Sequence, residues 1–270
     1  MFTKQEIFEQ LKALGVPQNK PVTTHTSLKK IGDVEGRAAG LLDVLIEYVT
    51  ADGGLLCVPT HTHANLYRDD IITLDFLNLN TNIGKLSEVA MNDKRGVHTV
   101  NPSHSMIIFG DRKEAERFAK YDETIKTVTS PEGCYGRLFE EDGYILLMGV
   151  GQEKNTFIHC IDEMLQLPSR LSEQDIDTTV RYPDGHIEHF PIRTFVAHMT
   201  AVGDVSHRFP TYEPAFRWHS CIQDGMIGNA PTQLCSAKKM AEVAKLIYDR
   251  SGGIDFLGEN RPFIDEKYYK

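Results

Sequence analysis

The chain has 270 residues, of which 41% are hydrophobic and 25% are charged, a composition typical of a folded globular protein and not of a disordered one. Its formal net charge of -9 argues against a nucleic-acid-binding protein, since such proteins present basic patches, and is compatible with a cationic partner. No stretch approaches the roughly 18 consecutive apolar residues that a membrane span needs, so neither nucleic acid nor a membrane is an expected partner.

The cysteines and the N-terminal residues indicate the cellular compartment of the protein. Five cysteines are scattered along the chain without a C-x-x-C pair, which argues against a disulfide framework or a structural zinc site. The opening residues MFTKQEIFEQLKALG form a polar amphipathic pattern and not a signal peptide. We therefore expect a reduced, cytoplasmic protein. With no internal repeat or clear linker, residues 1–270 are expected to form a single domain with a polar tail at 251–270.

The first part of the chain predicts a helix, a strand, a second helix and a second strand. Thr3 and Glu6 have the spacing of a capping box at the start of the first helix. Strands are expected at 22–25 and 55–59, and the helix between them has its apolar residues at 41–49. A strand, a helix and a strand in this order suggest a βαβ unit, in which the two strands pair in parallel.

The middle of the chain alternates between loops and short elements. Residues 61–82 are polar without a periodic pattern, and a loop of this length inside a compact domain is usually functional. A helix is expected near 85–92, a strand at 105–109 and a helix at 112–120. The segment 129–138 is rich in turn-forming residues.

The stretch 144–167 is the most informative one in the chain. An apolar run at 144–148 predicts a buried strand. Gly149 and Gly151 end this run and allow the backbone to turn or to approach a ligand closely. Asn155 then supplies a side chain that can cap the start of a helix.

Candidate catalytic side chains lie on one face of that helix. His159, Asp162 and Glu163 fall opposite its apolar stripe, and residues three or four apart on a helix lie close together. A carboxylate beside an imidazole holds its tautomer and stabilises its protonated form, which suits a general base. The alternative is an ordinary solvated face that carries structural ion pairs.

The C-terminal part predicts a hairpin, a strand and a helix. Two alternating runs within 176–192 flank an Asp-Gly pair, which is a strong signal for a β-hairpin. Residues 200–220 have an irregular pattern, and a last strand is expected from Gly225 to Cys235. Ser236 can cap a final helix that ends at Gly252.

Two further motifs carry candidate chemistry. In HTSLKKIG, Ser27 can cap a helix whose free backbone N–H groups bind phosphate, with Lys29 and Lys30 adding positive charge; the alternative is a plain capped turn. His61 and His63 form an H-x-H pair that can bind a metal, as a metal-dependent hydrolase needs, and the alternative is a polar loop. The sequence contains no Walker or dinucleotide glycine pattern.

A histidine and a serine stand next to each other at the start of the strand expected at 105–109. His104 and Ser105 are residue types of a nucleophile pair, but adjacent residues of a strand point to opposite faces. The sequence also lacks a G-x-S-x-G elbow, so a serine hydrolase is poorly supported.

Taken together, these segments resemble the aminoglycoside 3-N-acetyltransferase family, antibiotic acetyltransferases that do not use the common acetyltransferase fold. HTSLKKIGDVEG resembles that family's His-Ser-Ser-Leu…Gly segment, and GGLLCVPTHT its Gly-Thr…Met-Pro-Thr strand. NIGKLSEVAMNDKRGVHTVNPSHSMIIFG resembles its Met-Gly-x-x-x-Glu helix and the Arg-Ser-x-His-Pro strand that follows. YILLMGVGQEKNTFIHCIDE resembles its Leu-Leu-Gly-Val…Asn-Thr…His…Glu segment, and several motifs in the right order are fairly specific.

The resemblance implies a fold and a reaction. The fold is α/β, a three-layer α/β/α sandwich around a mixed, largely parallel central sheet, with a C-terminal β-hairpin region. The reaction is acetyl transfer from acetyl-coenzyme A (acetyl-CoA) to an amine of an aminoglycoside or a similar cationic amino-sugar, a reaction of antibiotic resistance for which no metal is expected. Coenzyme A and a cationic amine are the implied partners, and a homodimer is one candidate for the oligomeric state.

The resemblance also implies roles for individual residues. His159 is the implied catalytic base, with Asp162 or Glu163 as its supporting acid. The residues implied to bind the coenzyme are Thr26, Ser27, Leu28, Lys29, His104 and Ser105.

The sequence departs from the family pattern in one segment. Asn101 stands where the family usually has His, and His98-Thr99 stand where it has Arg-Ser, which leaves the coenzyme contacts and the substrate preference open. Two alternatives to the acetyltransferase also remain open. One is a metal-dependent hydrolase built on His61 and His63, and the other is a non-catalytic coenzyme-binding protein of the same fold.

Overall fold

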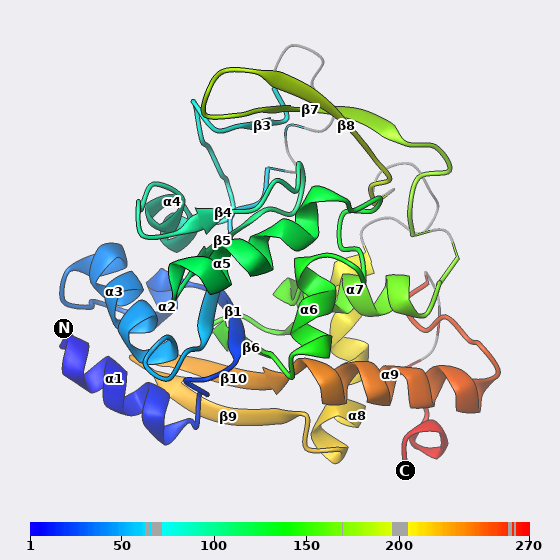
Figure 1. Cartoon of the computed structure of the whole chain (residues 1–270). Helices are drawn as coiled ribbons and strands as arrows, with labels where there is room; N and C mark the ends of the chain where they lie inside the picture. The colour runs from blue at the N-terminus through cyan, green and yellow to red at the C-terminus, as the bar shows by residue number, and fades with distance from the viewer. Residues whose placement is uncertain (63–64, 66–71, 169, 196–204, 259–260, 262) are drawn as a thin grey trace.

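The computed structural model describes residues 1–62, 65, 72–168, 170–195, 205–258, 261 and 263–270. Within these residues a seven-stranded sheet forms the middle of the molecule (Figure 1). Across the sheet the strands lie in the order β4 (Val97–His98), β5 (Met106–Phe109), β2 (Leu55–Pro59), β1 (Pro21–Thr26), β6 (Tyr144–Met148), β10 (Ala230–Ser236) and β9 (Ile222–Ile227). The strands expected at 22–25, 55–59, 105–109 and 144–148 are thereby confirmed.

The sheet is mixed, as the family resemblance implies. β1 pairs in parallel with β2 and with β6, whereas the outer strands pair antiparallel. Parallel pairing is thus confined to the three central strands. The sheet therefore contains fewer parallel pairs than the predicted, largely parallel sheet. The reason is partly the length of the connections: two residues join β9 to β10, and so short a turn joins only antiparallel strands.

Helices cover both faces of this sheet, which confirms the three-layer α/β/α sandwich (Figure 1). One face packs against α1 (Lys4–Ala13), α2 (Leu28–Ile31), α3 (Arg37–Val49) and α4 (Lys85–Met91). The other packs against α5 (Arg112–Ala119), α6 (Cys134–Glu140), α7 (Phe157–Met164), α8 (Glu213–Trp218) and α9 (Ala237–Ser251). The short 3-10 helices within the described residues are η2 (Lys120–Glu123), η3 (Gln152–Lys154), η4 (Val205–Tyr212) and η5 (Glu266–Tyr268). In the described part of the chain, no helix has the length and apolar character needed to cross a membrane.

A second, three-stranded sheet stands apart from the first, at the top of Figure 1. It consists of β3 (Leu74–Asp75), β7 (Ile176–Arg181) and β8 (Ile187–Ile192), and β7 and β8 form the predicted hairpin. The N–H of Tyr182 donates to the carbonyl of His186 at 2.9 Å across its turn. The last residue of β8 leads directly toward the site described below.

The last strand is β10, but its expected extent over 225–235 is wrong, because β9 ends at Ile227 and a turn separates it from β10. Gly228 lies in the left-handed region with a φ of 57°. Its N–H donates to Gln10 Oε1 at 2.7 Å, and the N–H of Asn229 donates to the carbonyl of Ile31 at 3.0 Å. Contacts with residues distant in the sequence therefore fix this turn, and the local pattern does not reveal them.

The irregular segment expected at 200–220 is also wrong where the structure describes it. Residues 205–218 form η4 and α8, which pack into the core through aromatic side chains. Residues 200–204 lie outside the described residues, as does much of the loop expected at 61–82. The turn-rich segment 129–138 holds the first residues of α6.

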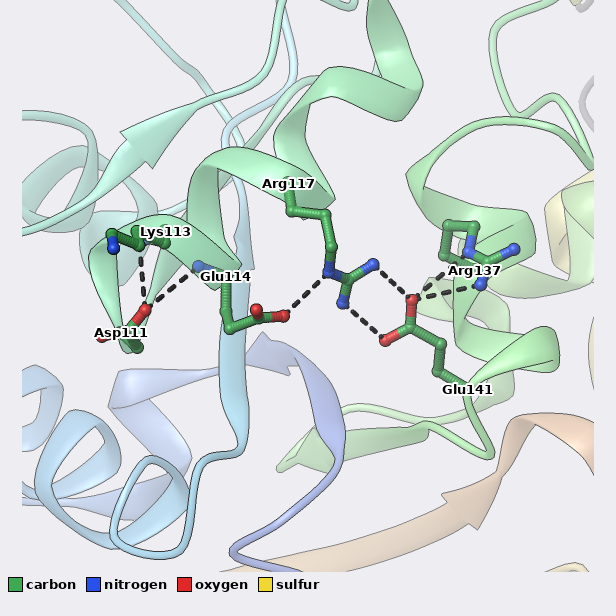
Figure 2. Close-up of polar contacts among 6 residues, drawn as sticks. All are labelled: Asp111, Lys113, Glu114, Arg117, Arg137 and Glu141. Carbon is green, nitrogen blue, oxygen red and sulfur yellow. Dashed lines mark hydrogen bonds and ion pairs between the residues drawn. The ribbon is translucent and has the colours of Figure 1, made fainter.

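Side-chain contacts on the surface join α5 to α6 (Figure 2). Asp111 caps α5 by accepting hydrogen bonds from two backbone N–H groups of its first turn, at 3.0 and 3.2 Å. Arg117 lies between Glu114 and Glu141, and Glu141 also pairs with Arg137. Pairs near the surface contribute little stability each, so this network links the two helices without adding much to the stability of the fold.

Gly149 ends β6 and turns the chain toward α7. Its φ of 69° lies in the left-handed region. A Cβ at this position would lie 2.9 Å from Cβ of Lys30 and 3.2 Å from Cβ of Ala230. The position therefore needs glycine for its conformation, as the sequence predicts, and also for close packing, which the sequence does not predict.

Replacing Gly149 by alanine should lower the free energy of unfolding by about 2–4 kcal/mol, because left-handed strain and a steric clash add together. Gly185→Ala is the matched control: its φ is 91°, and no described atom lies within 4 Å of its Cβ position. The control should lose only about 1 kcal/mol. Urea unfolding followed by circular dichroism measures both values, and equal losses would contradict the packing argument.

Candidate active site

A cleft of about 600 Å³ opens at the carboxyl ends of β1 and β2, beside the start of α7. The carboxyl ends of parallel strands are where open α/β sheets bind ligands. The described residues of its wall are Thr24, His25, Thr26, His61, Asn82, Ile83, Gly84, Leu86, Ser87, Ser103, His104, Val150, Glu153, Lys154, Asn155, Thr156, His159, Thr194, Phe195, Ser206 and Phe209. The wall thus combines imidazoles and hydroxyls with a few apolar side chains.

Asn155 fixes the start of α7, in agreement with its predicted capping role. Its Oδ1 accepts a hydrogen bond from the N–H of Phe157 at 3.2 Å, and its Nδ2 donates to Gln152 Oε1 at 2.9 Å. Thr156 occupies the N-cap position, and its side chain makes no capping hydrogen bond. A buried amide therefore sets the direction of the helix that brings His159 into the cleft wall.

His159 lies within a cluster of aromatic rings. The ring of Phe195 stacks on its imidazole, with the centroids 4.0 Å apart and the planes at 25°. Phe209 meets the imidazole edge-on with a centroid distance of 4.7 Å, and the ring of His104 is 6.4 Å away. Neither phenylalanine can be predicted from the sequence, because both are distant from His159 in the chain and stand in no recognisable motif.

Asp162 is fully buried and pairs with Arg170, whose Nε lies 3.2 Å from its Oδ2. Nη2 of Arg170 also lies 2.5 Å from Oδ1 of Asp255. Burial raises the pKa of Asp162 to about 7, and the guanidinium of Arg170 opposes the rise. Asp162 therefore ties α7 to the segment that follows α9.

Glu163 accepts hydrogen bonds from the hydroxyl of Thr127 and from the hydroxyl and N–H of Thr129, the last two at 2.6 and 3.1 Å. Burial raises the pKa of Glu163, and these donors oppose the rise. The bonds that the structure describes for both acids thus lead away from His159. The support of His159 by Asp162 or Glu163 stays a prediction.

The fold places only some of the residues expected to bind the coenzyme in the wall of the cleft. Thr26 and His104 line the cleft, whereas Ser27, Leu28, Lys29 and Ser105 are not among the described residues of its wall. Oγ of Ser105 lies 3.1 Å from Oγ1 of Thr60 in the interior. Leu28 packs against the core beside α3, and Lys29 is exposed. Their roles in coenzyme binding stay predictions.

The capping role expected of Ser27 is wrong. Ser27 stands at the N-cap of α2, but its hydroxyl makes no capping hydrogen bond, and α2 is a single turn of four residues. The N–H of Ser27 donates instead to the carbonyl of Met148 at 2.8 Å. Ser27 therefore extends the pairing of β1 with β6, which the local motif does not reveal.

Asn101, one of the departures from the family pattern, builds the turn that presents His104. Its Oδ1 accepts from the N–H groups of Ser103 and His104 at 3.1 and 2.8 Å, and its Nδ2 donates to the carbonyl of Val128 at 2.9 Å. Nδ1 of His104 lies 2.8 Å from Oγ of Ser103. The amide thus holds the backbone shape that places His104 in the cleft.

His61 also lines the cleft, whereas its expected metal partner His63 lies outside the described residues. Nε2 of His61 lies 2.9 Å from the hydroxyl of Tyr135, and its ring centroid is 4.5 Å from that of His104. In the parts of the chain that are described, no group of three or more histidine, cysteine or acidic side chains is placed to hold a metal. The metal pair therefore stays a prediction.

His25 is a cleft residue to which the sequence analysis gives no role. Its Nε2 is buried without a hydrogen-bond partner among the described residues. Burial lowers the pKa of His25 to about 4, and the nearby charge of Lys154 lowers it further. The signal that can reveal such a residue is its position, at the carboxyl end of a central parallel strand.

Comparison with known proteins gives the family. The model of the aminoglycoside 3-N-acetyltransferase family matches residues 24–248, so the chain belongs to this family. The SPbeta prophage-derived aminoglycoside N(3')-acetyltransferase-like protein YokD of Bacillus subtilis (strain 168) is 25% identical over 175 residues, 58% of this chain and 63% of that protein. Aminoglycoside N(3)-acetyltransferase IV of Salmonella sp is 26% identical over 165 residues, 61% of this chain and 60% of that protein. The match spans less than two thirds of either curated relative.

Solved structures share the fold. The apoenzyme of aminoglycoside acetyltransferase AAC(3)-IVa superposes with a TM-score of 0.75 at 21% identity, covering 97% of this chain and 92% of that one. AAC-IIIb in its binary complex with CoASH gives 0.77 at 18% identity, covering 96% and 99%. AAC-VIa bound to sisomicin gives 0.72 at 18% identity, covering 90% and 95%. These likenesses confirm the α/β fold.

The burial of His25 should make the protein less stable in mild acid. Its pKa of about 4 in the folded chain lies below the ordinary 6.5, so the unfolded chain binds an extra proton between these pH values. The free energy of unfolding should fall by about 2 kcal/mol as the pH drops through this range, because only the unfolded chain takes up this proton. Denaturant unfolding at about pH 7 and pH 4.5 should show a smaller drop in His25→Gln than in the wild type. An equal drop in both proteins would contradict this.

Proposed function

We propose that the protein is an acetyl-CoA-dependent N-acetyltransferase whose acceptor is an amine of an aminoglycoside or a similar cationic amino-sugar. Membership of the family supports acetyl transfer to aminoglycosides. The observation that carries the proposal is the position of His159 in the cleft wall, on the segment that resembles the family's Asn-Thr…His…Glu motif. Modification of an antibiotic, and hence resistance to it, is the expected consequence.

The reaction needs a base, and His159 is the proposed one. An ammonium group has no free electron pair, so the acceptor attacks the carbonyl carbon of the thioester as a neutral amine, after its first proton has gone to solvent. His159 takes a second proton from the attacking nitrogen as the new C–N bond forms, and the C–S bond breaks. The imidazolium of His159 can then return its proton to the departing thiolate.

The donor is the expected second substrate of the cleft. Acetyl-CoA supplies an activated acyl group on a long arm that contains amides. The hydroxyls of Thr26 and Thr156 in the wall are suited to hydrogen bonds with such amides. Lys154, exposed in the same wall, supplies a positive charge for a phosphate group. The complex of AAC-IIIb with CoASH supports this choice of donor.

The acceptor is proposed from relatives and from the wall of the cleft. The similar enzyme AAC-VIa has been solved with sisomicin, and a histidine-to-alanine variant of AAC(3)-IVa with a gentamicin. Glu153 contributes a carboxylate to the described wall and can attract a protonated amine. The cytoplasmic location, the single domain and the homodimer of the sequence analysis stay predictions.

Replacing His159 by alanine should lower kcat by about 100-fold or more, because the general base is lost. Release of free thiol from acetyl-CoA, measured with gentamicin or sisomicin as acceptor, gives kcat and KM for each protein. His186→Ala is the matched control, since His186 lies exposed on the β7–β8 turn, away from the cleft. Full turnover in His159→Ala would exclude His159 as the base. Binding of acetyl-CoA without transfer to any amine would instead favour a non-catalytic coenzyme-binding protein.

A further inference from the structure

Glu163 and Phe195 belong to a closed chain of contacts that begins and ends on α7. The helix carries Glu163 and, one turn earlier, His159. From Glu163 the contacts lead to segment 127–129, from there to segment 193–195, and then back to the imidazole of His159.

The first link is the carboxylate of Glu163. It accepts hydrogen bonds from the hydroxyl of Thr127 and from both the hydroxyl and the N–H of Thr129. Hydrogen bonds to an ionised carboxylate are stronger than those between neutral groups, and three of them leave little freedom to the segment that donates them. Segment 127–129 is thereby fastened to the end of α7.

The second link joins the backbones of two segments. Thr127 and Arg193 form a parallel bridge, in which the N–H of Arg193 donates to the carbonyl of Lys126 at 2.9 Å. The N–H of Val128 donates in turn to the carbonyl of Arg193 at 3.2 Å. Val128 is also part of the small apolar cluster against which Phe195 packs.

The third link places the ring of Phe195. The carbonyl of Ser172 accepts from Nε of Arg193 at 2.6 Å, and the N–H of Ser172 donates to the carbonyl of Thr194 at 2.8 Å. The backbone before Phe195 is therefore held from two sides. Its ring then stacks on His159 with centroids 4.0 Å apart.

We propose that Phe195 is a positioning residue for His159, and that Glu163 acts on His159 through segments 127–129 and 193–195. The stacked ring fixes the plane of the imidazole and keeps water from one of its faces. When His159 takes a proton, the face of the phenyl ring also stabilises the resulting cation. The inference rests on the proposed role of His159 as the base.

Other titratable groups near His159 also influence its proton affinity. On its own helix, Asp162 is paired with Arg170. The guanidinium of Arg193 lies near enough to Glu163 to lower its pKa. Further charged or titratable side chains of the cleft wall are His25, His61, His104, Glu153 and Lys154. Variants that leave all these titratable groups in place therefore isolate the effect of the contacts themselves.

Phe195→Leu should lower kcat by roughly tenfold and change KM by less than about twofold, since misorientation of the base affects the chemical step. The pH at which kcat is half-maximal should fall by about half a unit to one unit, because the imidazolium loses the aromatic face. Phe195→Tyr keeps the ring and should restore both values. Phe190→Leu is the matched control, since Phe190 packs against the same apolar cluster but is not among the described residues of the cleft wall. Equal effects of the two leucine variants would overturn the role of Phe195.

A double-mutant cycle tests the part of Glu163. Thr129→Val removes a hydroxyl donor to Glu163 and should lower kcat by about threefold to tenfold. Combined with Phe195→Leu it should add little, because both changes break the same chain of contacts. Thr50→Val removes a comparable hydrogen bond, to the carbonyl of Ile46 in α3, and serves as the control. Independent, additive losses would show that Glu163 does not act through Phe195.

Nuclear magnetic resonance of labelled histidine separates this inference from the proposed function, because it needs no substrate. Stacking on Phe195 should shift the ring-proton signals of His159, and Phe195→Leu should remove that shift. Thr129→Val should move the same signals, whereas Phe190→Leu and Thr50→Val should not. If these shifts appear but no acetyl transfer occurs, the positioning holds and the proposed function fails. Unchanged signals in Phe195→Leu would overturn the positioning even in an active enzyme.

Discussion

The parallel pairing of β1 with β6 is the constraint on which the site depends. The two strands run in register from Val22 beside Tyr144 to Thr26 beside Met148, so they end at the same level. One more hydrogen bond, from the N–H of Ser27 to the carbonyl of Met148, continues the pairing past the strand ends. Because both strands must leave the sheet there, β1 contributes its last residues to the cleft, and β6 leads through a glycine turn into α7.

The helix α7 has eight residues, too few to be stable without tertiary contacts. Three polar side chains anchor it: Asn155 at its start, and Asp162 and Glu163 near its end. Removing charged groups from water is costly, and Arg170 and the threonine donors offset this cost only with well-formed bonds. His159 therefore stands on a helix held at several points, which favours a fixed orientation over mobility.

The sequence predicts those features that depend on local patterns. The strand at 144–148, the turn after it and the helix bearing His159 follow from apolar runs, glycine and periodicity. Spacing on a helix also predicts that Glu163 lies near His159, but it does not predict the partner, and the threonines of segment 127–129 provide one. The position of Phe195 and the turn between β9 and β10 cannot be predicted from local patterns either, because contacts between distant segments determine both.

We infer that the cleft at the carboxyl ends of β1 and β2 binds the acyl donor beside His159. Calorimetric titration with acetyl-CoA tests it without any assumption about the acceptor. The wild type should give a saturable one-to-one isotherm, and Thr26→Trp, which places a large ring in the cleft, should bind about tenfold more weakly or worse. No binding at about millimolar donor, or equal affinity in both proteins, would contradict the account.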